Sequence, residues 1–273
     1  MNPVQKLIKL IADAIAVGLV VSIIGGIATV IFAVGGITSL KNEIKEIKAN
    51  EEFTLYQADE SINKISLNLS TASLSLKQGD EFSVYYGEGF RIKDKNGVLY
   101  IEDTIKKMFD IASSHTVIVT VPKNKVFSKV NINSGAGSIY IEKLICDSFN
   151  LDSGVGTTEI DYIKVKSNAQ IDGGVGTLTI ADGSVNNLEY SVGVGKADVT
   201  AKLIGKSEIE SGIGDVKLCL TGGEKLYTLK GESGIGAIRV DGEILSDDSH
   251  LGTGANIVEI DGGIGTVRID FAS

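Results

Sequence analysis

A Gly-x-Gly motif returns seven times at intervals near 20 residues, and this spacing restricts the possible folds more than any other feature of the chain. The first glycines are Gly135, Gly154, Gly174, Gly193, Gly212, Gly234 and Gly263, separated by 19, 20, 19, 19, 22 and 29 residues. A repeat of this length is typical of solenoids, in which each repeat forms one turn. The widened last step contains an insertion at about 243–255.

Apolar residues recur at fixed offsets from each first glycine. Three residues before it stand Ile132, Leu151, Ile171, Tyr190, Ile209, Gly231 and Ile260. The middle of the motif is Ala136, Val155, Val175, Val194, Ile213, Ile235 and Ile264. Four residues after it come Ile139, Thr158, Leu178, Ala197, Val216, Ile238 and Val267, and six after it Ile141, Ile160, Ile180, Val199, Leu218, Val240 and Ile269. Alternation with a period of two indicates strands with one buried face, so each column predicts an apolar ladder that no single repeat could bury alone.

The sequence therefore predicts an all-β fold, a right-handed parallel β-solenoid with about seven regular Gly-x-Gly turns over 53–273. Each turn is expected to hold a strand after the glycines, a corner and a second strand. Seven turns at a strand spacing of about 4.8 Å give a rod of roughly 30 Å. The two cysteines, Cys146 and Cys219, would lie about four turns apart, which is too far for a disulfide, so two separate thiols are predicted.

Residues 53–130 predict the less regular start of the same β structure. ISLNLS and ASLSLKQG alternate like strands, and HTVIVTVPKN predicts a strand that ends at Pro122. Asn96-Gly97 lies between two strand-like runs and is a strong signal for the turn of a hairpin. The segment 104–114 interrupts the pattern and predicts a loop or short helix.

An uncharged stretch of 27 residues, from Ala14 to Leu40, predicts a transmembrane helix at 14–40. It is too long for the apolar core of a signal peptide. A buried helix hairpin broken at Gly25-Gly26 is the alternative, although the stretch has no polar face. Residues 41–52 predict a charged stalk, and the two lysines before the helix favour a cytoplasmic segment at 1–13. The chain is thus expected to be a single-pass membrane protein, in contact with lipid through 14–40, with its β-solenoid outside the cytoplasm.

Gly18, Ser22 and Gly26 recur every four residues along the predicted transmembrane helix. Small residues at this spacing allow two helices to approach closely, which predicts a possible homodimer through the helix. The alternative is that glycine is simply common in such helices. The formal net charge of -9 argues against nucleic acid as a partner, because phosphate binding needs clustered Lys and Arg.

The segment VIVTVPKNKVFSKVNINSGAGSIYIEKL at 117–144 and the later repeats resemble a family of bacterial membrane-anchored proteins. Their domain of unknown function is labelled "putative adhesin" and is related to the head domains of auto-transporter adhesins. The resemblance covers about 53–273. It implies a β-solenoid outside the cytoplasm, in the cell envelope, and it brings no catalytic residues. The insertion before the last repeat departs from the family's regular pattern.

One polar column could form a site. Two residues before the first glycines stand Asn133, Asp152, Asp172, Ser191, Glu210, Glu232 and Asp261. These side chains should face outward, and stacked carboxylates repel one another, which could favour a weakly bound calcium ion. The alternative is a solvated polar ladder that keeps the rod soluble. No cofactor is predicted, because each Gly-x-Gly runs into a strand and not into the helix that a nucleotide loop requires.

The predicted function is that of a non-enzymatic, membrane-anchored envelope or cell-surface protein that presents its β-solenoid for binding or adhesion to cell-wall polymer or an envelope protein. An alternative is a regulatory membrane protein that senses envelope stress and acts through a partner membrane protein. A carbohydrate-active β-helix enzyme is the third interpretation. The short turns and the lack of a convergent acid–base set argue against it.

Overall fold

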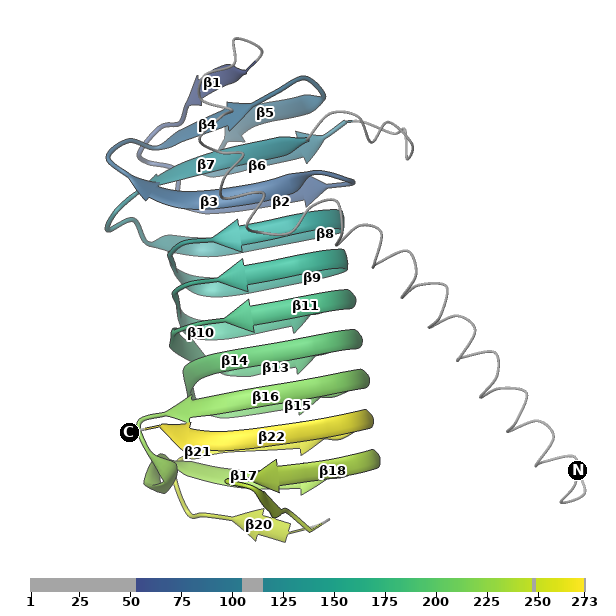
Figure 1. Cartoon of the computed structure of the whole chain (residues 1–273). Helices are drawn as coiled ribbons and strands as arrows, with labels where there is room; N and C mark the ends of the chain where they lie inside the picture. The colour runs from purple at the N-terminus through teal and green to yellow at the C-terminus, as the bar shows by residue number, and fades with distance from the viewer. Residues whose placement is uncertain (1–52, 105–114, 247–248, 273) are drawn as a thin grey trace, which may run out of the picture.

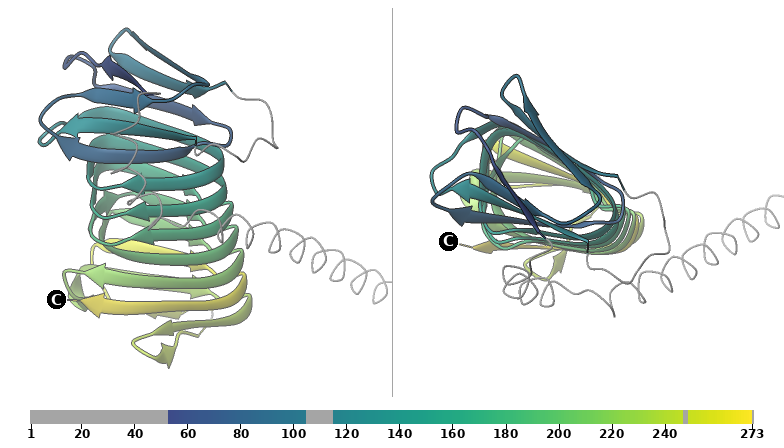
Figure 2. Two further views of the ribbon diagram at one scale, coloured as in Figure 1. Left: turned by 45° about the horizontal axis from the view of Figure 1, so that its top comes forward. Right: turned by 90° about the horizontal axis from the view of Figure 1, so that it is seen from above.

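The computed structural model describes residues 53–104, 115–246 and 249–272. In these residues the chain forms an all-β rod of stacked turns (Figure 1). Seen along its axis, the turns superimpose around a common interior (Figure 2). The prediction of an all-β, solenoid-like fold is confirmed. The sense in which the turns wind stays a prediction.

The first third of the rod consists of shorter strands. They are β1 (Thr54–Gln57), β2 (Lys64–Leu69), β3 (Ser73–Gly79), β4 (Ser83–Tyr86), β5 (Phe90–Lys95), β6 (Val98–Asp103) and β7 (Thr116–Pro122). The predicted hairpin is confirmed: β5 and β6 pair in antiparallel fashion, and Asn96 and Gly97 between them have φ of 53° and 73°. Two consecutive positive φ values match the right-handed twist of the flanking strands.

The strands of the repeats follow, and the longest of them continue through the Gly-x-Gly corner. They are β8 (Phe127–Ile141), β9 (Leu144–Ile160), β10 (Ile163–Asp172), β11 (Val175–Ile180), β12 (Gly183–Asn186), β13 (Leu188–Ser191), β14 (Val194–Ile204), β15 (Lys206–Glu210) and β16 (Ile213–Thr221). The last part holds a 3₁₀ helix (Glu224–Leu226) and then β17 (Tyr227–Glu232), β18 (Ile235–Val240), β19 (Glu243–Ile244), β20 (Ser249–Leu251), β21 (Asn256–Asp261) and β22 (Ile264–Ala272).

Each regular turn has three strand segments where the sequence predicted two. The segments after the glycines stack in parallel and form the post-glycine face, which includes β11, β14, β16, β22 and β18. The segments before the glycines form the pre-glycine face, which includes β2, the first halves of β8 and β9, the end of β10, β13, β15, β21 and β17. In one turn the short segment and the pre-glycine segment both belong to β10, and a bulge between Val165 and Asn168 separates them, since unpaired residues redirect a strand.

The order of the last turns in space differs from their order in the chain. β22 pairs in parallel with β16 and with β18, so Ile264 lies between Ile213 and Ile235. In the same way, β21 lies between β15 and β17. The seventh Gly-x-Gly repeat therefore lies between the fifth and the sixth, which corrects the expectation that successive repeats stack in sequence. The insertion at about 243–255 leads the chain back to the position between the fifth and sixth repeats. It contains β19 and β20, which pair with β18 and β17 in antiparallel fashion.

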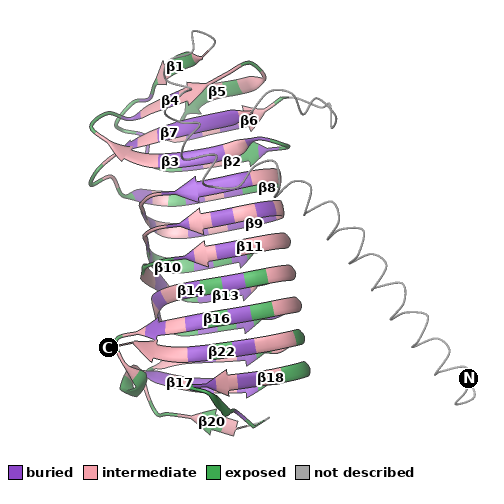
Figure 3. Ribbon diagram, viewed as in Figure 1, coloured by how far each residue is buried: buried purple, intermediate pink, exposed green. Residues whose placement is uncertain are grey.

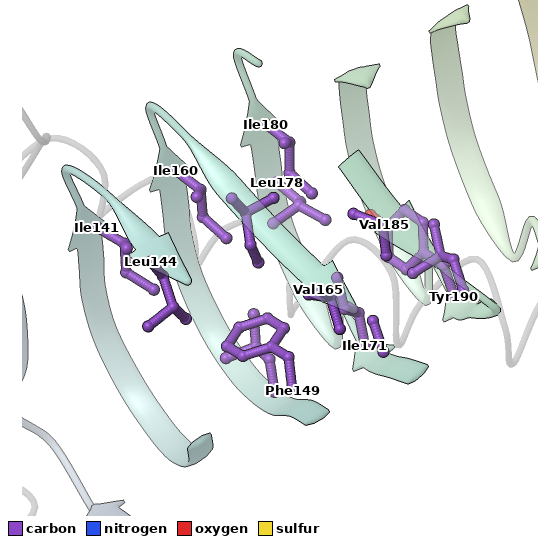
Figure 4. Packing of buried hydrophobic residues seen from close by; sticks show 14 of the residues in the cluster. Ile141, Leu144, Phe149, Ile160, Val165, Ile171, Leu178, Ile180, Val185 and Tyr190 are labelled. Carbon is purple, nitrogen blue, oxygen red and sulfur yellow. The ribbon is translucent and has the colours of Figure 1, made fainter. Parts of the chain in front are cut away.

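The interior is the set of apolar ladders that the repeat predicted (Figure 4). The columns three residues before and six residues after the first glycines are buried throughout, from Ile132 to Ile260 and from Ile141 to Ile269. The middle residues of the motif do not belong to this interior: Ile264 is 46% exposed and Ile235 is 74% exposed. The reason is the alternation itself, because a residue three positions before an inward-facing one must face outward.

The predicted cytoplasmic segment at 1–13, the transmembrane helix at 14–40 with Gly18, Ser22 and Gly26, and the stalk at 41–52 all lie outside the described residues. Most of the segment at 104–114 also lies outside them. Across 53–104, 115–246 and 249–272, the chain forms no helix with the length and hydropathy needed to span a bilayer.

Candidate functional site

The acidic column forms one continuous ladder on the outer surface of the pre-glycine face. In spatial order its members are Asn133, Asp152, Asp172, Ser191, Glu210, Asp261 and Glu232, each beside the next. The five predicted acidic residues Asp152, Asp172, Glu210, Glu232 and Asp261 are all exposed. We call this row the acidic ladder. The out-of-order turn places Glu210 beside Asp261 and not beside Glu232.

A second row, which sequence reasoning missed, runs beside the acidic ladder. Its members stand four residues before the first glycines and, in spatial order, are Asn131, Asn150, Gln170, Glu189, Glu208, Glu259 and Lys230. We call this row the amide ladder, after its first three members. The Oδ1 atom of Asn131 is buried, and no hydrogen-bond donor among the described residues reaches it. The signal that could have found this row is the fixed offset, since period-two alternation places it on the same outer surface as the acidic ladder.

Lysines neutralise one end of the amide ladder. The Lys206 Nζ atom lies 2.5 Å from Glu208 Oε1 and 2.9 Å from Glu259 Oε2, and Lys230 Nζ lies 3.0 Å from Glu259 Oε1. The hydrogen bonds from Lys206 and Lys230 lower the pKa of Glu259, and the bonds to Glu208 and Glu259 raise the pKa of Lys206. These pairs are largely exposed, so they order the surface more than they stabilise the fold.

The acidic ladder provides no formed metal centre. In the part of the chain that the structure describes, no three His, Cys, Asp or Glu side chains gather closely enough to hold a metal ion. Ser191 and Asn133 also limit the length of each run of carboxylates. Calcium prefers six to eight oxygen ligands, which one carboxylate per turn does not supply. The calcium hypothesis therefore stays a prediction.

One of the two described histidines, His115, belongs to a corner among the first strands. The ring of His115 stacks on Phe90 at 4.6 Å, and its Nε2 lies 3.7 Å from Asp103 Oδ1. The Oδ2 atom of Asp103 accepts hydrogen bonds from the backbone N–H groups of Ser70 and Thr71 at 3.2 and 3.0 Å. Asp103 thereby holds the corner that packs against the first Gly-x-Gly motif. His115 and Asp103 are therefore structural parts of this corner.

An open hollow of about 390 Å³ lies beside the loops that follow β1, β3 and β7. Its lining is Glu60, Gly79, Asp80, Pro122, Lys123, Asn124 and Lys125. Lys123 and Asp80 form an exposed ion pair of 3.2 Å across it. The hollow contains no Ser, Cys or His that could serve as a nucleophile or a base, and it does not include either ladder.

Comparison with known proteins identifies the family and supports the fold. The family model described as Toastrack DUF4097 matches residues 62–250. The structure is similar to that of a putative adhesin from Bacteroides fragilis, with a TM-score of 0.52 and 17% sequence identity over 81% of this chain and 98% of that chain. A putative cell adhesion protein from Clostridium sporogenes matches with a TM-score of 0.35 and 16% identity over 81% of this chain and 99% of that one. No curated protein is similar enough in sequence to be recognised as a relative.

Proposed function

The chain belongs to the Toastrack DUF4097 family, and we propose that it is a non-enzymatic surface protein whose pre-glycine face binds an extended, hydroxyl-rich polymer of the cell envelope. One observation carries the proposal: two ladders of hydrogen-bonding side chains repeat in register along that face. A repeating surface of this kind suits a ligand that also repeats along its length, because one contact can then be made in every turn. The proposed rod is a right-handed parallel β-solenoid.

The charge of the face narrows the class of polymer. The acidic ladder contributes Asp152, Asp172, Glu210, Asp261 and Glu232. The amide ladder adds three glutamates. Two of them, Glu208 and Glu259, form ion pairs with lysines, whereas Glu189 forms none with the described residues. Such a surface repels polyanions. We therefore infer a neutral or cationic glycan, whose hydroxyl or amino groups donate hydrogen bonds to the amide and carboxylate oxygens.

The place of this rod in the cell follows from the N-terminal sequence. The proposed anchor is the uncharged stretch at 14–40, with the N-terminus in the cytoplasm and residues 53–273 on the outer side of the membrane. The similar structure from Bacteroides fragilis is that of a putative adhesin, which supports a protein that acts at a surface. That name belongs to the other protein, and the role proposed for this chain is argued from its own acidic and amide ladders.

Co-sedimentation with insoluble wall polysaccharide tests the proposal. The full chain is incubated with purified wall glycans, and the bound fraction is compared with that of the double variant Asn150→Ala/Gln170→Ala. The two side chains contribute about 1 kcal/mol each through their hydrogen bonds, so we expect a loss of affinity of roughly 30-fold.

The matched control is Thr177→Ala/Thr179→Ala, which changes two outward side chains of the same region on the post-glycine face. It should bind like the unchanged chain. If the unchanged chain stays in the supernatant with every glycan, or if both double variants lose the same affinity, the pre-glycine face is not the binding surface.

A further inference from the structure

The amide ladder continues beyond Asn131 toward the N-terminal end of the rod. Asn131 pairs with Ser66 of β2, and Ser66 pairs with Tyr100 of β6, both in parallel register. Buried and exposed residues alternate along the stacked strands, so each offset becomes a continuous row on the surface (Figure 3). Five neighbouring strands therefore present a row of uncharged side chains, which we call the neutral track: Tyr100, Ser66, Asn131, Asn150 and Gln170.

The fold does not use the polar groups of the neutral track. Within the part of the chain that the structure describes, none of its five side chains forms a hydrogen bond or an ion pair. Amides with a structural role behave differently, since the Nδ2 atoms of Asn186 and Asn187 each donate to a backbone carbonyl oxygen at 2.8 Å. Gln170 is exposed, and the other four members of the track are half-buried. The hydroxyl and amide groups of the track are therefore left for water or for a ligand.

The charges around the first three strands of the neutral track favour an uncharged ligand. The acidic ladder reaches these strands as Asn68 and Asn133, which are neutral. Next to Asn68 lies Glu102, whose carboxylate forms ion pairs of 3.4 and 3.6 Å with two basic residues of β5. On the other side of the track the exposed residues Lys64 and Lys129 pair with each other. A cationic sugar would meet these lysines before it met an unpaired carboxylate.

Tyr100 gives the neutral track an aromatic end. The Lys93 Nζ atom lies 5.4 Å from the centroid of the Tyr100 ring and comes from β5, on one side of β6. On the other side of β6 lies Ser66, whose side chain is too short to cover a tyrosine ring. The C–H groups of a sugar carry partial positive charge, and the face of an aromatic ring attracts them as it attracts an ammonium group. A sugar ring can therefore stack on Tyr100 above Ser66, with Asn131 next to it.

We propose, on the basis of the function proposed above for the pre-glycine face, that the neutral track binds a neutral, N-acetylated glycan with one sugar stacked on Tyr100. The track covers four strand spacings of about 4.8 Å, or roughly 19 Å. An extended β-linked glycan advances by a similar length per sugar, so each strand meets one sugar. The side-chain amides of Asn and Gln both donate and accept hydrogen bonds, and so does the acetamido group of an N-acetylated sugar.

Calorimetric titration of the full chain with soluble N-acetylglucosamine oligomers of increasing length tests this assignment. Affinity should rise with length up to about five sugars, one for each strand of the track, and then level off. Tyr100→Ala should weaken binding of the pentamer by about tenfold or more, whereas Tyr100→Phe keeps the ring and should stay within about threefold of the unchanged chain. Ser66→Ile should also weaken binding by about tenfold, because its branched side chain suits a strand and covers the ring without altering Tyr100.

The matched control is Tyr162→Ala. Tyr162 is also half-buried, and its ring lies 5.5 Å from Lys143 Nζ, but it is not part of the neutral track. This variant should bind the pentamer like the unchanged chain. Equal losses in Tyr100→Ala and Tyr162→Ala would overturn the proposal, because a general effect on the fold would then explain both.

The outcomes also distinguish this subsite from the proposed function. If Asn150→Ala/Gln170→Ala reduces sedimentation with wall glycan while Tyr100→Ala binds the pentamer as tightly as the unchanged chain, the stacking subsite is wrong and the binding face stands. If the unchanged chain sediments with wall glycan but binds no N-acetylglucosamine oligomer, the assigned class of sugar is wrong. A chain that sediments with no glycan contradicts the proposed function and this subsite together.

Discussion

Replacing Gly214 by alanine should destabilise the rod far more than the usual cost of an alanine at a positive φ. Gly214 has a φ of 143°, and a Cβ atom there would lie 1.7 Å from Gly195 O in the neighbouring turn. Contacts of a real Cβ atom begin near 3.4 Å, so the two turns would have to separate by more than an ångström. A ladder hydrogen bond has a donor–acceptor distance near 2.9 Å and does not survive such a separation.

The magnitude follows from the bonds that are lost. Breaking two ladder bonds and leaving their groups buried and unpaired costs about 1–3 kcal/mol for each group. Two broken bonds leave four such groups, so adding about 1–2 kcal/mol for the backbone conformation gives a total of at least ~5 kcal/mol. A domain of this kind is stable by about 5–15 kcal/mol, so Gly214→Ala removes a large part of that stability.

Two other glycines provide matched controls with a positive φ. Gly242 has a φ of 88°, and a Cβ atom added there would have no atom within 4 Å, so Gly242→Ala should cost only about 1–2 kcal/mol. Gly222 has a φ of 96°, and its Cβ would lie 2.8 Å from the flexible end of Leu226 and 3.9 Å from the Lys202 side chain. Gly222→Ala should therefore fall between the other two variants.

Urea unfolding of the three variants measures this order. The chain has no tryptophan and eight tyrosines, so tyrosine fluorescence and far-UV circular dichroism are suitable signals. The midpoints should decrease from Gly242→Ala to Gly222→Ala to Gly214→Ala with similar slopes. If Gly214→Ala and Gly242→Ala unfold at the same urea concentration, close packing of glycine on glycine is not what positions the turns.

Three further predictions concern the core and the surface. Leu218 is fully buried, and Leu218→Ala should lower the free energy of unfolding by about 2–5 kcal/mol in the same urea assay. A thiol reagent should modify Cys219 in the folded chain well before Cys146, because burial raises the pKa of the Cys146 thiol to about 12; equal rates would contradict this. The hydrogen bonds from Lys206 and Lys230 lower the pKa of Glu259 below its ordinary value of 4.5. The ionised Glu259 side chain therefore stabilises the fold above pH 4.5, and this stabilisation is lost as the pH falls through the lowered pKa. Thermal unfolding should therefore be less sensitive to pH in Glu259→Gln than in the unchanged chain below pH 4.5, and identical pH profiles would contradict the pairing.

The interior of the rod could be predicted from the sequence because its packing repeats. Once Ile141, Ile160 and Ile180 occupy the same offset, stacking in register places them in one ladder, and the structure buries all three. The outward position of Ile235 and Ile264 was also contained in the alternation. Hydrophobicity alone indicates burial at this column, whereas the direction of the side chain places it on the surface, where apolar atoms still contribute much of the accessible area of a folded protein.

The order of the last turns could not be predicted from the motifs. Gly212, Gly234 and Gly263 each begin a Gly-Ile-Gly segment followed by the same buried offsets. Their edges are therefore chemically equivalent, and the repeat indicates which residues stack without indicating which turns are neighbours. Only the long steps of 22 and 29 residues suggested an irregularity there.

The candidate site was predicted in part for a related reason. The acidic ladder has similar side chains at one offset, so it is visible along the sequence. The residues of the amide ladder change from Asn131 and Asn150 to Gln170 and then to glutamates. They therefore do not stand out as one row in the sequence and are recognised only in space. Its neutral part and its acidic part become one surface only when the turns are stacked.

The out-of-order turn also determines what the end of the rod presents. In a simple solenoid the last strand of the chain would form the final edge. Here β22 is bonded on both sides, and even its Ala272 O accepts hydrogen bonds from the N–H groups of Gly222 and Gly223 at 2.9 and 3.0 Å. The C-terminal strand is therefore enclosed within the stack, and the last turn is formed by β17 and β18, which are internal segments of the chain. The insertion that lets the seventh repeat return out of order also covers part of that last turn, because β19 and β20 pair with β18 and β17 in antiparallel fashion.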